Sequence, residues 1–288
     1  METTKNKERV KKPDWLKIKL PSGESFSEVK KNVAENRLHT ICESGQCPNQ
    51  TECWGVGTAT LMILGNVCTR SCMFCSVATG KPESVDISEP LRVAQSIKMM
   101  GLKHAVITSV DRDDLADGGS TIWAATVRAI RKHAPGVTME TLIPDFQGKW
   151  ENLQRIIDVK PEVVSHNLET VKRLTREVRI QAKYERSLEV LDRLKKGGID
   201  RTKSGIMLGL GETEAELIEA MEELRTQSVD ILTLGQYLQP TKAHLAVVEY
   251  ITPDDFERYR LLGLKMGFRF VESGPMVRSS YHAEKHIV

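Results

Sequence analysis

Cysteine is absent from the chain after Cys75, although the 288 residues include six cysteines. Aromatic residues are also scarce, at 5%, and no basic stretch is interleaved with them, so there is no obvious platform for stacking nucleic-acid bases. Neither sign of charge dominates, because 41 Lys and Arg residues face 39 Asp and Glu residues. The net charge of +2 gives no reason to expect a nucleic-acid partner. No apolar run is long enough to cross a bilayer, so no membrane partner is expected.

Several common catalytic motifs are missing as well. The sequence contains no G-x-S-x-G, H-E-x-x-H or G-x4-G-K-[ST] pattern, which excludes the common hydrolase and nucleotide-triphosphatase interpretations. The amino terminus has no apolar stretch of the signal-peptide type, and Glu2, Glu8 and Asp14 argue against a transit peptide. A reducing, cytoplasmic location is therefore expected.

The amino-terminal segment differs from the rest of the chain in its charge, because basic residues outnumber acidic ones there. These basic residues are Lys5, Lys7, Arg9, Lys11, Lys12, Lys17 and Lys19. Such a run is typical of a solvated, partly disordered tail. It also suits a docking arm for an acidic partner, and the sequence leaves both interpretations open.

The cysteines that are present form two groups of three. The first triad, with the spacing C-x4-C-x5-C, consists of Cys42, Cys47 and Cys53. The second triad, with the spacing C-x3-C-x2-C, consists of Cys68, Cys72 and Cys75. Each iron of a [4Fe–4S] cluster usually binds one cysteine thiolate, so three thiolates leave one iron free for another ligand. Two triads therefore predict two clusters, each with one coordination position that no cysteine fills.

Disulfides and zinc are the alternatives to clusters. A disulfide scaffold is typical of small secreted domains, whereas this chain is long enough for a large core without covalent cross-links. A structural zinc site usually combines two C-x2-4-C pairs, or one such pair with two histidines. Neither triad contains a histidine, and the nearest one, His39, precedes Cys42. The spacing therefore favours clusters, with zinc as the remaining alternative.

After the cysteine region, short β-rich runs alternate with amphipathic patterns of helical period. The predicted strands cover 60–66, 104–110, 137–143, 162–166, 205–210 and 230–236. The predicted helices cover 89–100, 121–133, 149–158, 185–196, 214–227 and 253–266. Ser88 and Thr213 are predicted N-caps, and Gly101 and Gly197 are predicted helix stops.

Strand–helix alternation predicts parallel strands joined by right-handed crossover helices. Six such units are two short of a closed barrel, so the predicted fold class is α/β, a partial (βα)6 TIM-like barrel, with a doubly wound sheet as the alternative. The barrel is predicted to cover residues 57–267, between a cysteine-rich N-terminal extension (1–56) and a short C-terminal extension (268–288), with an extra strand at 268–271. The second triad directly follows the first predicted strand, at the edge where such folds carry their chemistry.

Both triads and a segment near the carboxyl end match the pattern of one enzyme family. The second triad has the spacing of the radical S-adenosylmethionine (SAM) superfamily, and the first has the spacing seen in lipoyl synthases. The segment 274–281, Gly-Pro-Met-Val-Arg-Ser-Ser-Tyr, contains the Arg-Ser-Ser-Tyr signature of that family. Further matching segments are 58–65, 166–170, 207–213 and 235–241. From about His39 to His282, the chain therefore resembles lipoyl synthases.

The resemblance implies an enzyme, a radical SAM sulfurtransferase that inserts two sulfur atoms into an octanoyl chain, at carbons 6 and 8. The implied cofactors are two [4Fe–4S] clusters and SAM. The implied partners are octanoylated lipoyl domains of 2-oxo acid dehydrogenase E2 subunits and the glycine-cleavage H protein, together with an electron donor such as ferredoxin or flavodoxin. The target C–H bonds lie in a saturated chain with no carbonyl to acidify them, so this chemistry belongs to a radical-generating cofactor.

The resemblance also assigns a role to each triad. Cys68, Cys72 and Cys75 are implied to hold the cluster that binds SAM and generates the radical. The first triad is implied to hold an auxiliary cluster, with Ser280 as its fourth protein ligand, and this cluster donates its own sulfides. A serine oxygen is a harder ligand than a thiolate. We hypothesise that it leaves its iron more readily and opens the cluster to the substrate radical.

Two other segments at predicted strand ends are candidates for SAM binding. Asp117, Gly118 and Gly119 follow the second predicted strand, and the glycines allow close backbone approach to the methionine group of SAM. A solvated turn with an Asp N-cap is the alternative. Asn167 and Glu169 end the fourth predicted strand and are candidates for the sugar or amino group of SAM, with a helix start as the alternative.

Two further polar residues fall on predicted strands. Glu140 has apolar and β-branched neighbours and is predicted to point into the barrel, where a carboxylate needs a partner. That partner is either SAM or a cation of the protein. His166 is predicted to be a packed, hydrogen-bonded histidine rather than a ligand.

Overall fold

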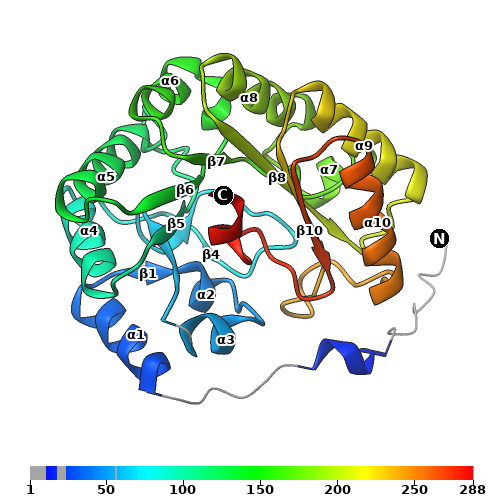
Figure 1. Ribbon diagram of the computed structural model, residues 1–288, viewed down its shortest axis with the longest axis horizontal. Helices are drawn as coiled ribbons and strands as arrows, with labels where there is room; N and C mark the ends of the chain where they lie inside the picture. The colour runs from blue at the N-terminus through cyan, green and yellow to red at the C-terminus, as the bar shows by residue number, and fades with distance from the viewer. Residues whose placement is uncertain (1–10, 18–23, 56, 288) are drawn as a thin grey trace.

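The structure, a computed structural model, describes residues 11–17, 24–55 and 57–287, and at Glu24 the backbone alone. Most of the basic amino-terminal residues lie outside these ranges. The prediction that they form a tail or a docking arm therefore concerns residues that the structure does not describe. Within the described ranges the chain forms one large, mostly parallel sheet surrounded by helices (Figure 1).

The sheet has the order β1-β2-β5-β6-β7-β8-β9-β10. Every neighbouring pair is parallel except β1–β2. The strands are β1 (His39–Thr40), β2 (Thr60–Ile63), β5 (His104–Ser109), β6 (Thr138–Leu142), β7 (Val163–Ser165), β8 (Arg201–Leu208), β9 (Ile231–Gln236) and β10 (Phe270–Gly274). In the described part of the chain β1 and β10 end the sheet without pairing with each other, so the barrel stays open. This confirms the predicted partial barrel.

The extra strand predicted at 268–271 is present as β10, with its bounds shifted to Phe270–Gly274. β10 pairs in parallel with β9, from Phe270 opposite Ile231 to Gly274 opposite Gly235. It therefore adds a further parallel strand to the six predicted from the repeating units. A second, two-stranded sheet joins β3 (Val67–Cys68) and β4 (Ala78–Thr79) in the loop that follows β2.

Helices cover the outer face of the sheet (Figure 1). They are α4 (Glu89–Met99), α5 (Ser120–His133), α6 (Trp150–Val159), α8 (Tyr184–Lys196), α9 (Glu214–Thr226) and α10 (Pro253–Lys265). Each lies within a residue or two of its predicted range. Their apolar faces form two buried clusters, one centred on β2, β5 and β6 and the other on β8, β9 and β10. This burial of apolar surface stabilises the barrel.

Both predicted N-cap residues start their helices, but only Thr213 caps its helix with the side chain. The Thr213 side chain accepts from the Glu216 amide, and Glu216 reaches back to the Thr213 amide, which forms a capping box at the start of α9. Ser88 is the N-cap residue of α4, as predicted, but its backbone is already helical and its side chain makes no cap bond. Its hydroxyl donates to Asp86 Oδ1 (2.6 Å) instead.

The amino- and carboxyl-terminal parts of the chain lie on the open side of the barrel. Three helices of the N-terminal extension lie near β1 (Figure 1): α1 (Glu24–Glu35), α2 (Ile41–Ser44) and α3 (Gln50–Gly55). Of these, α2 contacts both β1 and β2. The short helix η4 (Ala283–Ile287) lies in the middle of the barrel, where it contacts β5. The boundaries predicted near residues 56 and 267 remain a proposal.

The barrel interior contains a buried ion pair. Lys203 Nζ lies 2.9 Å from Glu140 Oε2, and neither side chain is exposed. Ser165 Oγ donates to Glu140 Oε1 (2.8 Å), and His286 Nδ1 of η4 lies 3.4 Å from Lys203 Nζ. Of the two partners predicted for Glu140, the structure therefore contains the cation of the protein.

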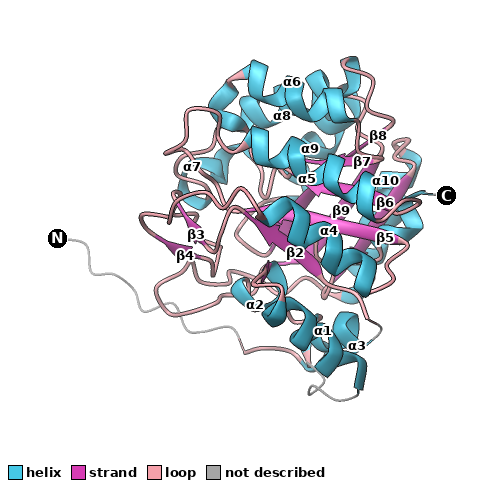
Figure 2. Cartoon of the chain, turned by 90° about the vertical axis from the view of Figure 1, so that its left-hand side faces the viewer, coloured by secondary structure: helices cyan, strands magenta, loops and turns pink. Residues whose placement is uncertain are grey.

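The two ends of the barrel differ in what they carry. In Figure 2, β3, β4 and α7 (Thr175–Val178) lie at one end and the carboxyl terminus lies at the other.

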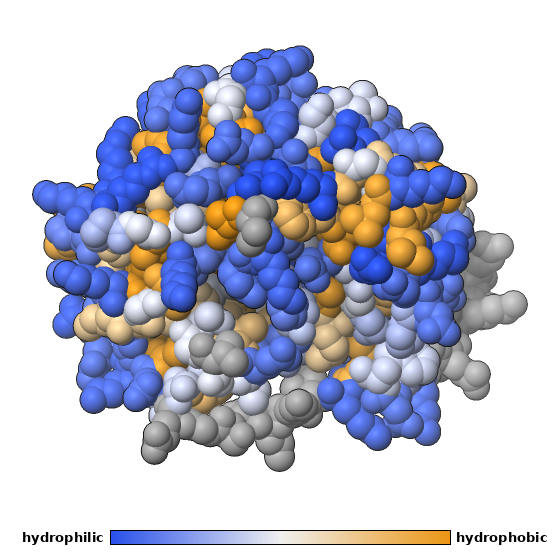
Figure 3. All heavy atoms as spheres, in the orientation of Figure 1, coloured by the Kyte–Doolittle hydropathy of each residue, from blue (hydrophilic) through white to orange (hydrophobic). Residues whose placement is uncertain are grey.

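The face seen in Figure 1 is mainly hydrophilic, with apolar residues scattered between polar ones (Figure 3). Among the described residues, no helix combines the length and the apolar character needed to cross a membrane.

Candidate active site

A cavity of about 500 Å³ opens at the carboxyl ends of the strands. Residues from the N-terminal extension, the loop after β2, the ends of several strands and the carboxyl-terminal segment line it. The predicted site residues among them are Cys42, Cys47, Cys68, Cys72, Cys75, Asn167, Glu169 and Ser280. Cys53 is half-buried and is not among the lining residues. The fold therefore brings members of both triads to one space.

The loop that carries the second triad is fixed by contacts with distant backbone. The amides of Arg70 and Asp111 both donate to Cys68 Sγ (3.4 Å each). The Met73 amide donates to the Val178 carbonyl (2.9 Å), and His244 Nε2 donates to the Cys75 carbonyl (3.0 Å). The protein therefore sets the path of this loop from both flanks.

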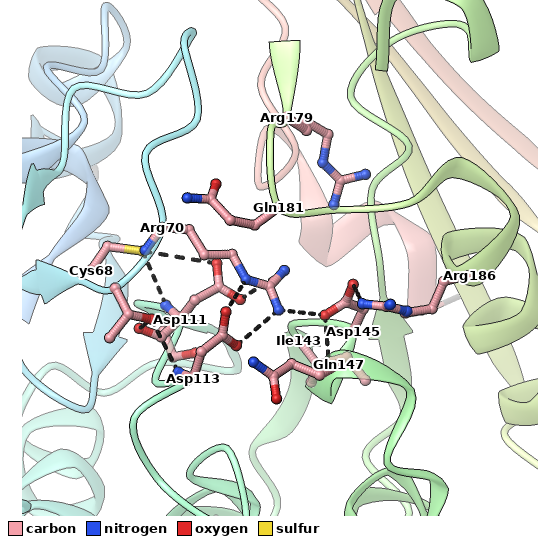
Figure 4. Close-up of polar contacts among 12 residues, drawn as sticks. Cys68, Arg70, Asp111, Asp113, Ile143, Asp145, Gln147, Arg179, Gln181 and Arg186 are labelled. Carbon is pink, nitrogen blue, oxygen red and sulfur yellow. Dashed lines mark hydrogen bonds and ion pairs between the residues drawn. The ribbon is translucent and has the colours of Figure 1, made fainter. Parts of the chain in front are cut away.

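Arg70, which lies between Cys68 and Cys72, forms a buried network that the sequence did not indicate (Figure 4). Its Nε donates to Asp113 Oδ2 (2.7 Å), and its Nη2 donates to Asp145 Oδ1 (2.6 Å). Asp111 Oδ1 lies 3.4 Å from Nη1. Burial alone would raise the pKa of Asp145, but the Arg70 guanidinium holds that pKa below its ordinary value. Two features of the sequence could have predicted this network: an arginine lies inside the second cysteine triad, and a run of acidic residues follows the next strand.

Burial raises the pKa of every cysteine thiol in the two triads. The pKa of Cys42 rises to about 11 and that of Cys72 to about 12. Arginines oppose this effect, Arg179 at Cys72 and Arg278 at Cys47. Buried thiols of this kind stay protonated unless a bound cation compensates the thiolate charge.

The donor set fits an iron–sulfur cluster. The second triad supplies three thiols to the cavity and no histidine, which is the chemistry of a cluster with one iron left free. In the described part of the chain, no three His, Cys, Asp or Glu side chains converge closely enough to hold a single metal ion.

Asn167 and Glu169 face the cavity beside this loop. Asn167 Nδ2 donates to Glu169 Oε1 (3.0 Å), whereas Asn167 Oδ1 is buried and has no hydrogen-bond partner within the described structure. Burial raises the pKa of Glu169, and Arg179 opposes that shift. The alternative of a helix start at Asn167 is wrong, because the next helix, η3, begins at Lys172. An unsatisfied buried acceptor in a cavity fits a polar group of a ligand.

Asp117, Gly118 and Gly119 do not line the cavity. Asp117 Oδ1 accepts from the Gly119 amide and Oδ2 from the Thr121 amide (3.0 Å each) at the start of α5. Both glycines have a positive φ, and a side chain at Gly119 would overlap Leu64. The Asp117 side chain therefore bridges this turn, whereas the N-cap residue of α5 is Gly119, and SAM binding by these residues stays a prediction.

The carboxyl-terminal segment is tied to the extension next to the first triad. Asn49 Nδ2 donates to the Met276 carbonyl (2.7 Å), and the Tyr281 hydroxyl donates to Glu52 Oε1 (3.3 Å). Val277 packs so closely on Gly235 that a side chain there would overlap its carbonyl. These contacts hold Ser280 at the cavity wall that Cys42 and Cys47 also line.

Comparison with known proteins identifies the family. The radical SAM superfamily model matches residues 62–224, and the model of the N-terminal domain of lipoyl synthase matches residues 2–47. The lipoyl synthase of Flavobacterium psychrophilum is 67% identical over 97% of this chain and 96% of its own length. The chain belongs to the lipoyl synthase family. The mitochondrial lipoyl synthase of Nematostella vectensis, also 67% identical, has the same coverage.

Solved structures support the fold. The FeFe-hydrogenase maturase HydG from Carboxydothermus hydrogenoformans has a TM-score of 0.58 and 14% identity, and covers 91% of this chain and 77% of its own. Streptococcus suis SuiB bound to S-adenosylmethionine also has a TM-score of 0.58, with 12% identity over 85% of this chain and 55% of its own. Membership of the radical SAM superfamily implies an enzyme that uses SAM and a [4Fe–4S] cluster.

Proposed function

We propose that this lipoyl synthase family member is a sulfurtransferase that inserts sulfur at carbons 6 and 8 of an octanoyl chain carried on a lysine of a partner protein. One observation carries the proposal: cysteines of both triads and Ser280 line the same cavity. A radical formed at one wall would meet a sulfur source at another without leaving the protein.

We assign the SAM-binding cluster to Cys68, Cys72 and Cys75, and the auxiliary cluster to Cys42, Cys47, Cys53 and Ser280. When bound, the clusters and SAM supply the carbon radical and the sulfur that a saturated chain requires. The buried Asn167 Oδ1 lacks a partner within the described structure, which supports a donor from SAM at this position, with Glu169 beside it.

The apolar part of the cavity suits a hydrocarbon chain. Its wall combines side chains from the cysteine loop, the strand ends and the carboxyl-terminal segment: Met62, Phe74, Leu142, Ile143, Ile206 and Val277. These side chains would bury the octanoyl chain and exclude water from the radical. The proposed partners remain the octanoylated lipoyl domains of E2 subunits and the glycine-cleavage H protein, with ferredoxin or flavodoxin as electron donor.

Iron counting after anaerobic reconstitution tests the assignment of the clusters. We expect about eight irons per wild-type chain and about four when either triad is replaced by alanine. With SAM and a reductant, the first-triad variant should still release 5′-deoxyadenosine, and the second-triad variant should release none. An electron carrier would release none in any form, and a zinc protein would remain free of iron; either result would overturn the proposal.

A further inference from the structure

The carboxyl-terminal helix η4 lies inside the open barrel (Figure 1). Two of its residues, Ala283 and His286, are buried, and none of the His286 side chain is exposed. The end of a chain usually lies at the protein surface and is poorly ordered unless contacts hold it. The contacts of η4 therefore show what keeps this end in the barrel.

His286 joins η4 to the buried ion pair of the barrel. Lys203 Nζ donates to His286 Nδ1 (3.4 Å) as well as to Glu140 Oε2 (2.9 Å). A buried ammonium needs acceptors for its N–H groups, so loss of the imidazole would leave one Lys203 donor unsatisfied. On its other side, His286 Nε2 lies 3.7 Å from Glu272 Oε1 of β10. The imidazole therefore links β8 to β10.

Further contacts hold η4 against the same strands. Arg201 Nη1 of β8 donates to the Ile287 carbonyl (2.8 Å). The ring of Phe270 in β10 lies beside the His286 ring, with 5.6 Å between their centroids. The helix also contacts β5. Three strands of the barrel, β5, β8 and β10, therefore fix the position of η4.

A short turn connects η4 to Ser280. The Ala283 amide, at the start of η4, donates to the Ser280 carbonyl (3.4 Å), and the Tyr281 amide donates to the Arg278 carbonyl (2.9 Å). His282 lies within this turn and has a φ of 53°, a left-handed conformation that a residue other than glycine keeps only where its surroundings impose it. Because the turn is short and hydrogen-bonded, a displacement of η4 would move Ser280 as well.

We propose that η4 anchors the segment that carries Ser280, with His286 as a positioning residue for the auxiliary cluster. Asn49 and Glu52 of the extension bind this segment near the cavity, and η4 binds its other end to the barrel interior. With both ends held, the serine oxygen stays at the cavity wall before any cluster binds. This inference rests on the proposed function, which assigns Ser280 to the auxiliary cluster.

Carboxypeptidase digestion of the cluster-free, full-length chain tests the anchor. We expect His286→Leu to lose the residues of η4 about tenfold faster than the wild type, because this variant lacks a hydrogen bond to a charged group. His286→Gln should restore resistance, since its side-chain oxygen accepts from Lys203. Lys285→Leu is the matched control, because Lys285 lies on the same helix and is exposed.

Reconstitution with iron tests the positioning role. His286→Leu should bind about half as much iron as the wild type, because the first-triad cluster loses the ligand that η4 positions. Its EPR spectrum should keep the signal of the second-triad cluster and lose that of the first. His286→Gln and Lys285→Leu should bind as much iron as the wild type. A general loss of stability would instead reduce both signals.

The outcomes separate this inference from the proposed function. A wild-type enzyme without a first-triad cluster would overturn the proposed function, and digestion would still decide whether η4 is an anchor. Digestion of His286→Leu at the wild-type rate, or full iron content with an unchanged EPR spectrum, would overturn the inference alone.

Digestion of the wild-type chain in urea covers a His286→Leu chain that does not fold. Release of His286 should begin only at urea concentrations that unfold the barrel, because the anchor is part of its interior. Release of His286 while the barrel is still folded would overturn the inference.

Discussion

Ser280 is the residue on which the proposed role of the auxiliary cluster as sulfur donor depends most. It faces the cavity from a segment that hydrogen bonds with Asn49 and Glu52 of the extension hold in place, so the protein determines its position. A hard oxygen ligand binds iron of a sulfide-rich cluster less firmly than a thiolate does. Release of this ligand would expose one iron and its sulfides to the substrate.

Ser280→Cys should therefore retain the auxiliary cluster but slow sulfur insertion about tenfold, the scale seen when the environment of a metal ligand is altered. Formation of 5′-deoxyadenosine should continue. The measurement is the rate of product formation by mass spectrometry, with Ser279→Cys as the matched control because Ser279 also lines the cavity. Sulfur insertion as fast as in the wild type would refute the ligand-release hypothesis.

His166 confers a pH dependence on folding. It is buried, its Nδ1 donates to the Ile143 carbonyl (2.9 Å), and its Nε2 accepts from Ser187 Oγ (3.0 Å). Burial lowers its pKa to about 4, whereas the pKa of an imidazole in the unfolded chain is about 6.5. Between these values the unfolded chain binds more protons than the folded one, so stability falls as the pH falls.

From pH 7 to pH 5 this histidine should cost about 2 kcal/mol of unfolding free energy. Urea unfolding of the cluster-free protein at both pH values measures the loss. His166→Asn should be less stable at pH 7 and should show a loss smaller by about that amount. Equal losses in the two proteins would contradict this account of His166.

The sequence was informative about residues whose chemistry is unusual, and less so about their partners. The cysteines stand out by spacing alone, and five of the six line the cavity. Arg70 was missed because its partners Asp113 and Asp145 lie 43 and 75 residues along the chain. The partner of Glu140 was left open for the same reason, since Lys203 is 63 residues away.

At the scale of elements, the end of β9 controls the carboxyl-terminal segment. Gly235 leaves room for the Val277 carbonyl, and a methyl group in its place would overlap that carbonyl. Gly235→Ala should push the segment, and with it Ser280, away from the first triad. We expect loss of the auxiliary cluster, about half of the bound iron, with the second-triad cluster retained.

Iron analysis and EPR of the reconstituted variant measure this effect. Gly274→Ala is the matched control, since a Cβ there would lie 3.4 Å from Val277 Cγ2, an ordinary contact. The control should bind as much iron as the wild type. Full iron content in Gly235→Ala would show that the close contact does not position the segment.

Predictions of elements succeeded where a periodic pattern reached across a whole element. The helices from α4 to α10 that follow strands were predicted because their buried residues repeat with helical period. The N-cap at Thr213 was predicted because a capping box involves only neighbouring residues. In the extension, α2, α3 and β1 were missed because they are too short to show a period. Ser88 was predicted correctly as the N-cap residue of α4, but not the partner of its hydroxyl, which donates to Asp86 and makes no cap bond.

At the scale of the whole molecule, the open barrel is what allows the two triads to share one cavity. In a closed barrel the two edge strands would pair with each other, whereas here β1 and β10 end the sheet. Strand–helix alternation predicted the open form. The contact of Asn49 with Met276, across 227 residues, could not be predicted, because no local pattern encodes it.

The central claim is that the first triad carries the sulfur that reaches the product. Its most direct test is reconstitution of the enzyme with 34S-sulfide, followed by turnover with SAM, a reductant, unlabelled buffer and an octanoylated lipoyl domain. Mass spectrometry of that domain should show two added sulfurs, both heavy, and replacement of Cys42, Cys47 and Cys53 by alanine should abolish the gain. Light sulfur in the product, or a domain of unchanged mass while 5′-deoxyadenosine accumulates, would contradict the claim.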